Sequence, residues 1–157
     1  ENKQVGALSS VNGNITMQDN VSARDVNAVN GNIEINNNAQ VNELSTVNGD
    51  IQAQTYLSVK RDVSTVNGNI TLGADSMVGQ DVTTVNGDIY LTQTFVSNDI
   101  QTKNGSITLV DGSVVEGDIE FKSQEDGSWW SDKSREHNPP TLTIDASSDV
   151  KGALNGF

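Results

Sequence analysis

Short runs of alternating apolar and polar residues recur along most of the chain. Residues 63–65 and 70–72 read Val-Ser-Thr and Ile-Thr-Leu, and this alternation has the period of a half-buried β-strand. Asn67-Gly68 lies between the two runs, and both residues are typical of turns because they adopt positive φ at low cost. The pattern therefore predicts two short strands joined by a tight corner.

The same pattern is present six times at a nearly fixed spacing. Its corners are Asn12-Gly13, Asn30-Gly31, Asn48-Gly49, Asn67-Gly68, Asn86-Gly87 and Asn104-Gly105. The steps between successive glycines are 18, 18, 19, 19 and 18 residues. A short fixed period is typical of a solenoid, in which each repeat forms one coil on top of the last. We reject antiparallel hairpins, because only parallel coils place each residue against its own copy.

We therefore expect an all-β, single-domain parallel β-helix of about seven to eight coils, with 18–19 residues in each regular coil. Residues 1–10 form an N-terminal lead-in, and residues 11–121 carry the six regular coils. Residues 122–141 are an insertion at the next corner, and residues 142–157 form a degenerate C-terminal coil and cap. The usual handedness of parallel crossovers favours a right-handed coil. A left-handed prism stays open, because 18 residues are also three hexapeptides.

The composition suits a narrow core and argues against two classes of partner. Only 34% of the residues are hydrophobic, which is little for a globule but enough for a column one or two side chains wide. Nine Lys and Arg oppose 21 Asp and Glu, and the net charge is −12. Nucleic acids and anionic membranes bind basic faces, so neither is an expected partner. No stretch approaches the roughly 20 apolar residues of a membrane span, and the chain has no cysteine.

The six corner asparagines form one expected column. Stacked coils bring equivalent side chains to about 4.8 Å from one another, and amides at that spacing can hydrogen-bond along the column. We expect the Asn-Gly pairs to serve as structural turns that carry an asparagine ladder. A ligand-binding amide face is the alternative interpretation.

A second column is acidic. One position of the repeat holds Asp25, Glu43, Asp62, Asp81, Asp99 and Asp118. Stacking places these like charges some 5 Å apart, at a cost of about 0.9 kcal/mol for each neighbouring pair in water. We expect each carboxylate to offset this cost by accepting backbone N–H groups in its turn. A row of calcium ions is the alternative, because hard cations bind carboxylate oxygens; no other cofactor is expected.

Two functions that depend on particular side chains are not favoured. The outward positions mix Glu34, Gln52 and Tyr90 with threonine, whereas ice binding would call for a regular threonine face. Sugar cleavage requires paired carboxylates at a cleft, or a base with a metal. The repeats offer carboxylates only in columns, and His137 has no visible partner. We therefore expect no enzymatic activity, with a carbohydrate-active β-helix enzyme as the alternative.

The insertion contains both tryptophans of the chain, Trp129 and Trp130. The last coil of a solenoid must be capped, because an open end would pair with other strands. Adjacent residues of an extended segment face opposite ways, and Trp is common at binding surfaces. We expect one indole to help close the end of the stack, with ligand contact as the second role of this pair.

The repeated Ser/Thr-Val-Asn-Gly-Asp/Asn-Ile motif, with Val-x-x-Asp-apolar segments such as residues 78–82 between its copies, resembles bacterial adhesin families of β-strand-repeat proteins. These families include the auto-transporter adhesin head-like domain. The resemblance covers about residues 5–121 and 142–154. It implies a non-catalytic binding or scaffolding module that is secreted, periplasmic or exposed on the cell envelope. We expect an unknown surface protein or glycan as the partner, and consider end-to-end or face-to-face self-association of the chain as a further interaction.

Overall fold

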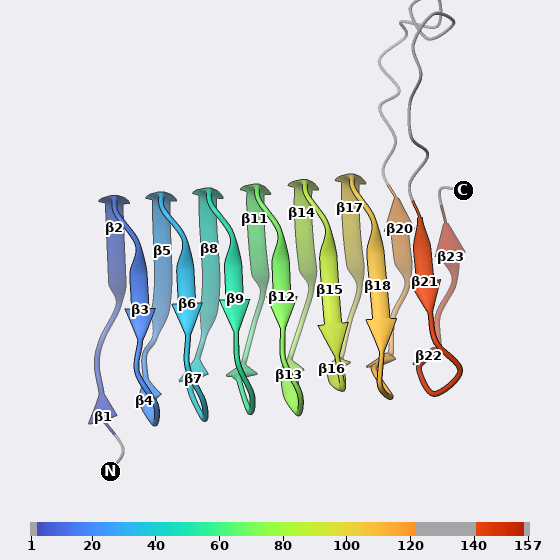
Figure 1. Ribbon diagram of the computed structural model, residues 1–157, viewed down its shortest axis with the longest axis horizontal. Coiled ribbons are helices and arrows are strands. Elements are labelled where there is room, and N and C mark those ends of the chain that lie inside the picture. Colours follow the sequence, from blue (N-terminus) through green and yellow to red (C-terminus); the bar gives the residue numbers. More distant parts are fainter. Residues whose placement is uncertain (1–2, 122–140, 156–157) are drawn as a thin grey trace, which may run out of the picture.

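A computed structural model describes residues 3–121 and 141–155, and these residues form an all-β, single-domain solenoid without a helix (Figure 1). Their strands form three sheets, which we call A, B and C. Sheet A contains β1 (Lys3–Gln4), β4 (Val21–Ser22), β7 (Gln40–Val41), β10 (Ser58–Val59), β13 (Ser76–Val78), β16 (Thr94–Val96), β19 (Val114–Val115) and β22 (Asp149–Val150). Sheet B contains β2 (Leu8–Asn12), β5 (Asp25–Asn30), β8 (Glu43–Asn48), β11 (Val63–Asn67), β14 (Val82–Asn86), β17 (Ile100–Asn104), β20 (Ile119–Phe121) and β23 (Leu154–Asn155). Sheet C contains β3 (Ile15–Met17), β6 (Ile33–Ile35), β9 (Ile51–Ala53), β12 (Ile70–Leu72), β15 (Ile89–Thr92), β18 (Ile107–Val110) and β21 (Leu142–Ile144).

Each coil visits sheet B, then sheet C, then sheet A, and every strand pairs in parallel with its equivalent one coil away. The expected parallel β-helix is therefore confirmed. In Figure 1 the strands of sheet B rise at the back and those of sheet C descend in front as the chain advances, which makes the coil right-handed. The regular stack makes about six turns before Phe121, and β21, β22 and β23 add one further strand to each sheet.

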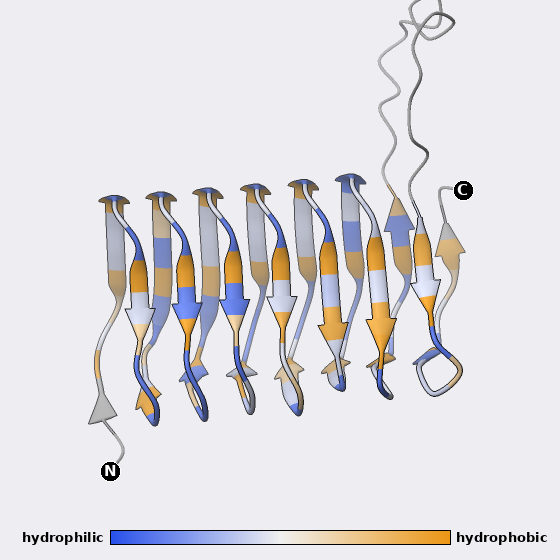
Figure 2. Cartoon of the chain, viewed as in Figure 1, coloured by the Kyte–Doolittle hydropathy of each residue, from blue (hydrophilic) through white to orange (hydrophobic). Residues whose placement is uncertain are grey.

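The core is built from columns of identical or similar residues. Strand pairing sets Ile51, Ile70 and Ile89 on top of one another, and all three are fully buried. A matching column on sheet B contains Leu44 and Val63. Figure 2 shows the hydrophobic positions aligned from one strand to the next. Burial of each such side chain contributes about 1.5–3 kcal/mol, so a composition of modest hydrophobicity supports the stack.

The Asn-Gly corner between sheets B and C differs from our expectation. The glycines from Gly31 to Gly105 do not have positive φ, and Gly13, at 158°, is extended. The reason for glycine is the close approach of the coils: a Cβ on Gly68 would lie 1.9 Å from the carbonyl oxygen of Gly49. Equivalent clashes, at 1.8 to 2.0 Å, would arise at Gly31, Gly49, Gly87 and Gly105.

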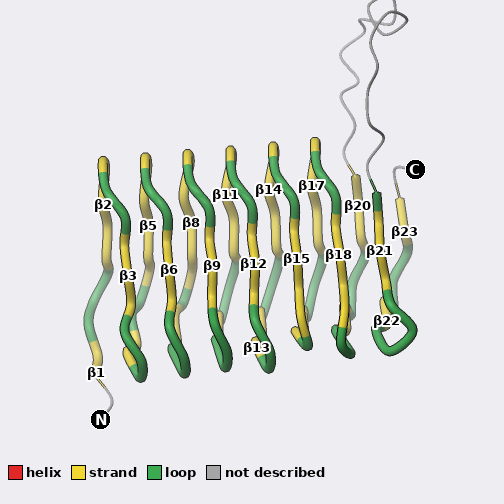
Figure 3. The backbone as a smooth tube through the Cα atoms, viewed as in Figure 1, coloured by secondary structure: helices red, strands yellow, loops and turns green. Residues whose placement is uncertain are grey.

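Left-handed backbone conformations occur instead at the next corner, between sheets C and A. This corner forms the loops along the lower edge of Figure 3. Its positive-φ residues have φ between 48° and 62° and are Asn20, Asn38, Tyr56, Asp75, Gln93 and Asp111. Asn and Asp adopt this conformation more readily than most residues, whereas Tyr56 and Gln93 have no such preference.

Candidate functional site

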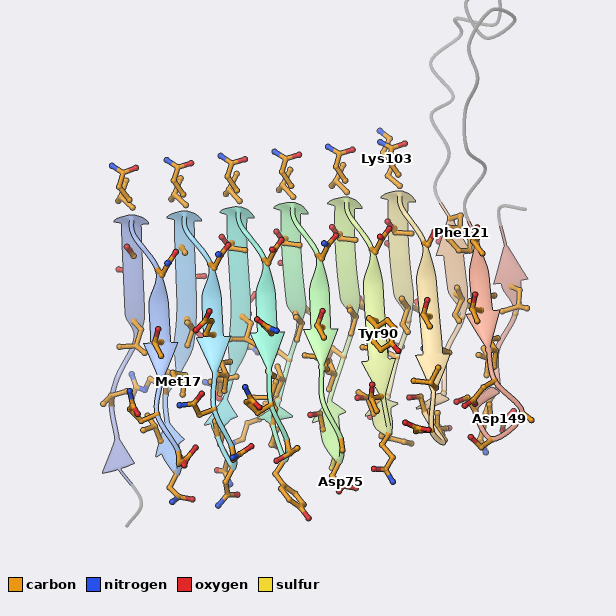
Figure 4. All side chains as sticks on the ribbon, in the orientation of Figure 1. Met17, Asp75, Tyr90, Lys103, Phe121 and Asp149 are labelled. Atoms are coloured by element: carbon orange, nitrogen blue, oxygen red, sulfur yellow. The ribbon has the colours of Figure 1, made fainter. Side chains whose placement is uncertain are left out.

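The corner asparagines lie in a continuous row along one edge of the solenoid, at the top of Figure 4. The Nδ2 group of Asn67 donates to Oδ1 of Asn48 at 2.8 Å, and Asn86 donates to Asn67 at 2.7 Å. Asn30, Asn48 and Asn104 donate in the same way, so that five bonds link the six side chains. Each inner amide therefore uses one of its two N–H donors and one of its two acceptor positions within the row.

The residue after each corner glycine forms a second ladder, which the sequence analysis missed. The side-chain oxygen of Asn69 accepts the backbone N–H of Asp88 at 2.8 Å. The same bond, at 2.8 to 2.9 Å, connects the residue pairs 14–32, 32–50, 50–69 and 88–106. The signal was present in the sequence, because this position holds only Asn, Asp or Ser. Its carboxylates are therefore engaged in holding one coil to the next.

The acidic column lies at the third corner, where sheet A leads into sheet B. Oδ1 of Asp81 accepts the backbone N–H of Asp99 at 3.1 Å and the side-chain amide of Asn98 at 2.8 Å. Asp62 and Asp99 accept the backbone N–H of the next aspartate in the column, and Asp118 accepts that of Ala153. Four of the six carboxylates thus accept backbone N–H groups, but these belong to the next coil and not, as we had expected, to the carboxylate's own turn. Within residues 3–121 and 141–155, no group of three or more His, Cys, Asp or Glu residues is arranged to hold a metal ion.

A hollow of about 640 Å³ opens beside the N-terminal part of this corner. Its polar lining includes Ser22, Arg24, Gln40, Asn42 and Lys60, contributed by three successive coils. The backbone holds these coils in register, because Asn42 N–H donates to the Arg24 carbonyl group and Arg61 N–H donates to the Asn42 carbonyl group, both at 2.8 Å. We call this feature the basic hollow.

Cationic side chains gather at the basic hollow although the chain as a whole is acidic. Of the five Lys and Arg side chains whose placement is described, Arg24, Lys60 and Arg61 lie at this corner, and all three are exposed. None of the three side chains has a hydrogen-bond or ion-pair partner among the described residues. A guanidinium group presents paired N–H donors that suit a carboxylate or sulfate group, and an ammonium group adds a point charge. The hollow can therefore bind an anionic group.

Sequence reasoning did not identify the basic hollow. Arg24 and Arg61 each precede an acidic-column residue, Asp25 or Asp62, and this repeated Arg-Asp pair was the available signal. That Lys60 and Arg24 line one hollow could not be read from the sequence, because they belong to coils two steps apart and the second of these coils has one extra residue. In the structure Ser58 pairs with Gln40, whereas Val63 pairs with Leu44, so residues 59–62 span the same gap as residues 41–43.

A row of exposed valines runs beside the asparagine ladder on the outer face of sheet B. Val29, Val47 and Val66 are 41%, 39% and 39% exposed, and Val11 is 64% exposed. Each of these valines precedes a corner asparagine in the sequence. The row is one side chain wide, so it presents an apolar strip rather than a broad patch.

Trp129 and Trp130 lie outside the described residues, so their expected end-cap and ligand-contact roles stay predictions. The part of the chain that the structure describes contains no helix capable of spanning a membrane. The chain matches no protein-family model, no curated protein and no solved structure.

Proposed function

We propose that this protein is a non-catalytic binding module whose basic hollow recognises an anionic group, such as the carboxylate or sulfate of an acidic glycan. We further propose that it acts outside the cytoplasm, in the periplasm, on the bacterial surface or after secretion. This setting and the adhesin role rest on the resemblance of its repeats to bacterial adhesin families.

One observation carries the proposal. Arg24 and Lys60 line the same hollow, are exposed and have no ion-pair partner among the described residues. The amide side chains of Gln40 and Asn42 lie in the same lining and can donate to and accept from sugar hydroxyl groups. A pair of cations flanked by amides suits a ligand that combines one negative charge with several hydroxyl groups.

The surrounding charge favours a small anionic group over a polyanion. Asp25 and Asp62 directly follow Arg24 and Arg61 in the sequence, and Glu43 holds the equivalent position of the coil between them. All three acidic residues are half-buried at this corner. The net charge of −12 repels a long polyanion beyond the reach of the two cations. We therefore expect a ligand that carries its charge at one point, such as a terminal acidic sugar.

The test is a glycan array that contains matched acidic and neutral glycans, followed by calorimetry on the glycans that bind. Loss of two charge-assisted hydrogen bonds costs about 1.5–3 kcal/mol each. The double variant Arg24→Ala/Lys60→Ala should therefore bind at least about tenfold more weakly. Lys103→Ala is the control, because Lys103 is a cation on the outer end of β17 and away from the hollow.

Two results would count against the proposal. The first is equal affinity of the double variant and the parent protein for an acidic glycan. The second is binding that is restricted to neutral glycans. A protein partner in place of a glycan would be detected by the same double variant, because the recognised group is still anionic.

A further inference from the structure

The next coil accepts the backbone N–H of the glycine in five of the six corner Asn-Gly pairs. A seventh Asn-Gly pair, Asn155-Gly156, lies outside these corners, and its glycine is not among the described residues. Gly13 N–H donates to the Asn30 carbonyl oxygen at 3.0 Å. Gly31, Gly49, Gly68 and Gly87 donate in the same way to the next corner asparagine, at 3.1 Å. In each of these five pairs, Oδ1 of the asparagine also accepts a bond from the side-chain amide of the next corner asparagine.

The sixth pair, Asn104-Gly105, differs on both counts. The following coil has no Asn-Gly corner, because residues 122–141 replace it in the sequence. Within residues 3–121 and 141–155, neither the Gly105 N–H nor Oδ1 of Asn104 has a hydrogen-bond partner. Asn104 is held on one side only, where its Nδ2 group donates to Asn86 at 2.7 Å.

Asn-Gly pairs undergo an intramolecular reaction that depends on this N–H group. The backbone nitrogen of the glycine, after losing its proton, attacks Cγ of the asparagine. A nitrogen–Cγ bond forms, the bond from Cγ to the side-chain amide breaks, and ammonia leaves with the displaced protons. Water then opens the succinimide ring at either carbonyl group, which yields aspartate or isoaspartate. Glycine reacts readily because it has no side chain to obstruct the ring closure.

A hydrogen-bonded N–H must first open before it can lose its proton, and local opening of a stacked coil costs free energy. The five inner pairs carry this cost, and the side-chain amide must in addition leave the ladder to reach the backbone nitrogen. Asn104-Gly105 lacks the first cost within the described structure, and the Asn104 side chain gives up only its one ladder bond, to Asn86. Asn104 and Gly105 are the two residue types that react most readily, and Asn104 is exposed to the water that opens the succinimide ring.

We propose that Asn104-Gly105 is a site of spontaneous deamidation in the folded protein, and that stacking protects the five preceding Asn-Gly pairs. The product places a carboxylate at the last rung of the ladder, where it can no longer donate to Oδ1 of Asn86. The isoaspartate product also lengthens the backbone at the corner that follows β17. The reaction therefore modifies the end of the stack and leaves the inner coils unchanged.

Tryptic peptide mapping measures each group of pairs separately, because cleavage after Lys103 and Lys122 isolates residues 104–122. Asn104 is the only asparagine in this peptide, so any deamidation of it is assigned without ambiguity. Residues 4–24, 25–60 and 62–103 carry the five inner pairs. The full chain is incubated in warm, mildly alkaline buffer, sampled over time and digested briefly at the mildly acidic end of the range in which trypsin still cleaves. A zero-time digest measures deamidation during handling.

We expect deamidation of Asn104 to be at least about tenfold faster than that of any inner Asn-Gly pair in the folded chain. The same chain in urea is the control, and there all six corner pairs should react at similar rates. A rate ratio that is the same in folded and unfolded chain would overturn the proposal. So would inner pairs that react as fast as Asn104 under folding conditions.

A variant separates backbone protection from side-chain protection. Asn104→Ser removes the reactive residue and the last rung, but it leaves the residue-104 carbonyl group that accepts Gly87 N–H. If the backbone bond protects, Asn86 should stay unreactive in this variant. Rapid deamidation of Asn86 would show that the ladder, rather than the backbone bond, is the protecting element, and our assignment of the protecting bond would be wrong.

Discussion

The α-carbon of Gly68 faces the carbonyl oxygen of Gly49 so closely that a Cβ at this position would lie 1.9 Å from it. Neighbouring coils therefore touch backbone to backbone at this corner. Gly68→Ala should destabilise the protein by about 1–3 kcal/mol or more. The added methyl group would meet backbone atoms, and this overpacking forces the coils apart. Urea denaturation followed by circular dichroism measures this change.

Gly6→Ala is the matched control for that substitution, because a Cβ on Gly6 has no atom within 4 Å. Its effect on the free energy of unfolding should stay within about 0.5 kcal/mol. Equal effects of the two substitutions would contradict the close approach of the coils.

The asparagine ladder makes a graded prediction. Asn67 takes part in two ladder bonds, one to Asn48 and one from Asn86, whereas Asn12 takes part in one. Each bond contributes about 0.5–1.5 kcal/mol, so Asn67→Ala should cost roughly twice as much as Asn12→Ala. Thermal melts of the parent and both variants test the ratio, and melting temperatures of both variants equal to that of the parent would mean that the ladder adds no stability.

The acidic column can be tested at Asp81. Its Oδ1 atom accepts two bonds, from Asp99 N–H and from the Asn98 side chain. Asp81→Asn keeps an acceptor oxygen and removes one like charge, so stability should be unchanged or higher. Asp81→Ala removes the acceptor and should cost about 1–3 kcal/mol, because the N–H groups lose their partner.

Added calcium tests the alternative interpretation of the acidic column, in which a row of calcium ions binds the carboxylates. We expect the melting temperature of the parent protein to be the same in chelator and in millimolar calcium, because backbone N–H groups occupy the carboxylates. A ligand that binds only the folded state raises the melting temperature. A clear rise with calcium, abolished by Asp81→Asn, would favour the row of calcium ions over the hydrogen-bonded turn.

Asp145 makes the protein sensitive to acid near its C-terminal end. The backbone N–H of Asp111 donates to Oδ2 of Asp145 at 2.8 Å, and the Ser148 hydroxyl group donates to Oδ1 at 2.8 Å. These bonds, the Asp111 contact first, hold the pKa of Asp145 below its ordinary value of 3.8. The folded state therefore gains stability above pH 3.8, and this gain is lost as the pH falls through the lowered pKa.

The measurement is the melting temperature between pH 2 and pH 6 for the parent protein and Asp145→Asn, a range about the ordinary aspartate pKa. The variant should show a smaller loss of stability in acid, because its side chain does not titrate. Parallel curves for the two proteins would mean that Asp145 has the same pKa in the folded and unfolded states.

The parallel β-helix could be predicted from the sequence because each residue stacks on its own copy, so the period of the chain is also the period of the fold. The reason for the corner glycines could not. An Asn-Gly pair suggests positive φ, yet Gly68 is required by the carbonyl group of Gly49, which is 19 residues away in the sequence. Contacts between coils are not visible in the local pattern.

The left-handed corner was missed for a different reason. Its six residues include Tyr56 and Gln93, whose side chains have no preference for positive φ. The stacked loops on either side impose the conformation, so the residue types vary. The basic hollow was equally hidden, because Arg24 and Lys60 come from coils two steps apart and line the same space only in the stacked structure.

The direction of the strands across the long axis has a mechanical consequence. Hydrogen bonds between coils lie along that axis, so tension applied between the two ends of the stack loads one interface after another instead of shearing a whole sheet. Each coil contacts only its neighbours, as in other solenoids. A pulled molecule should therefore lengthen in a series of similar steps, and each step should release the 18 or 19 residues of one coil.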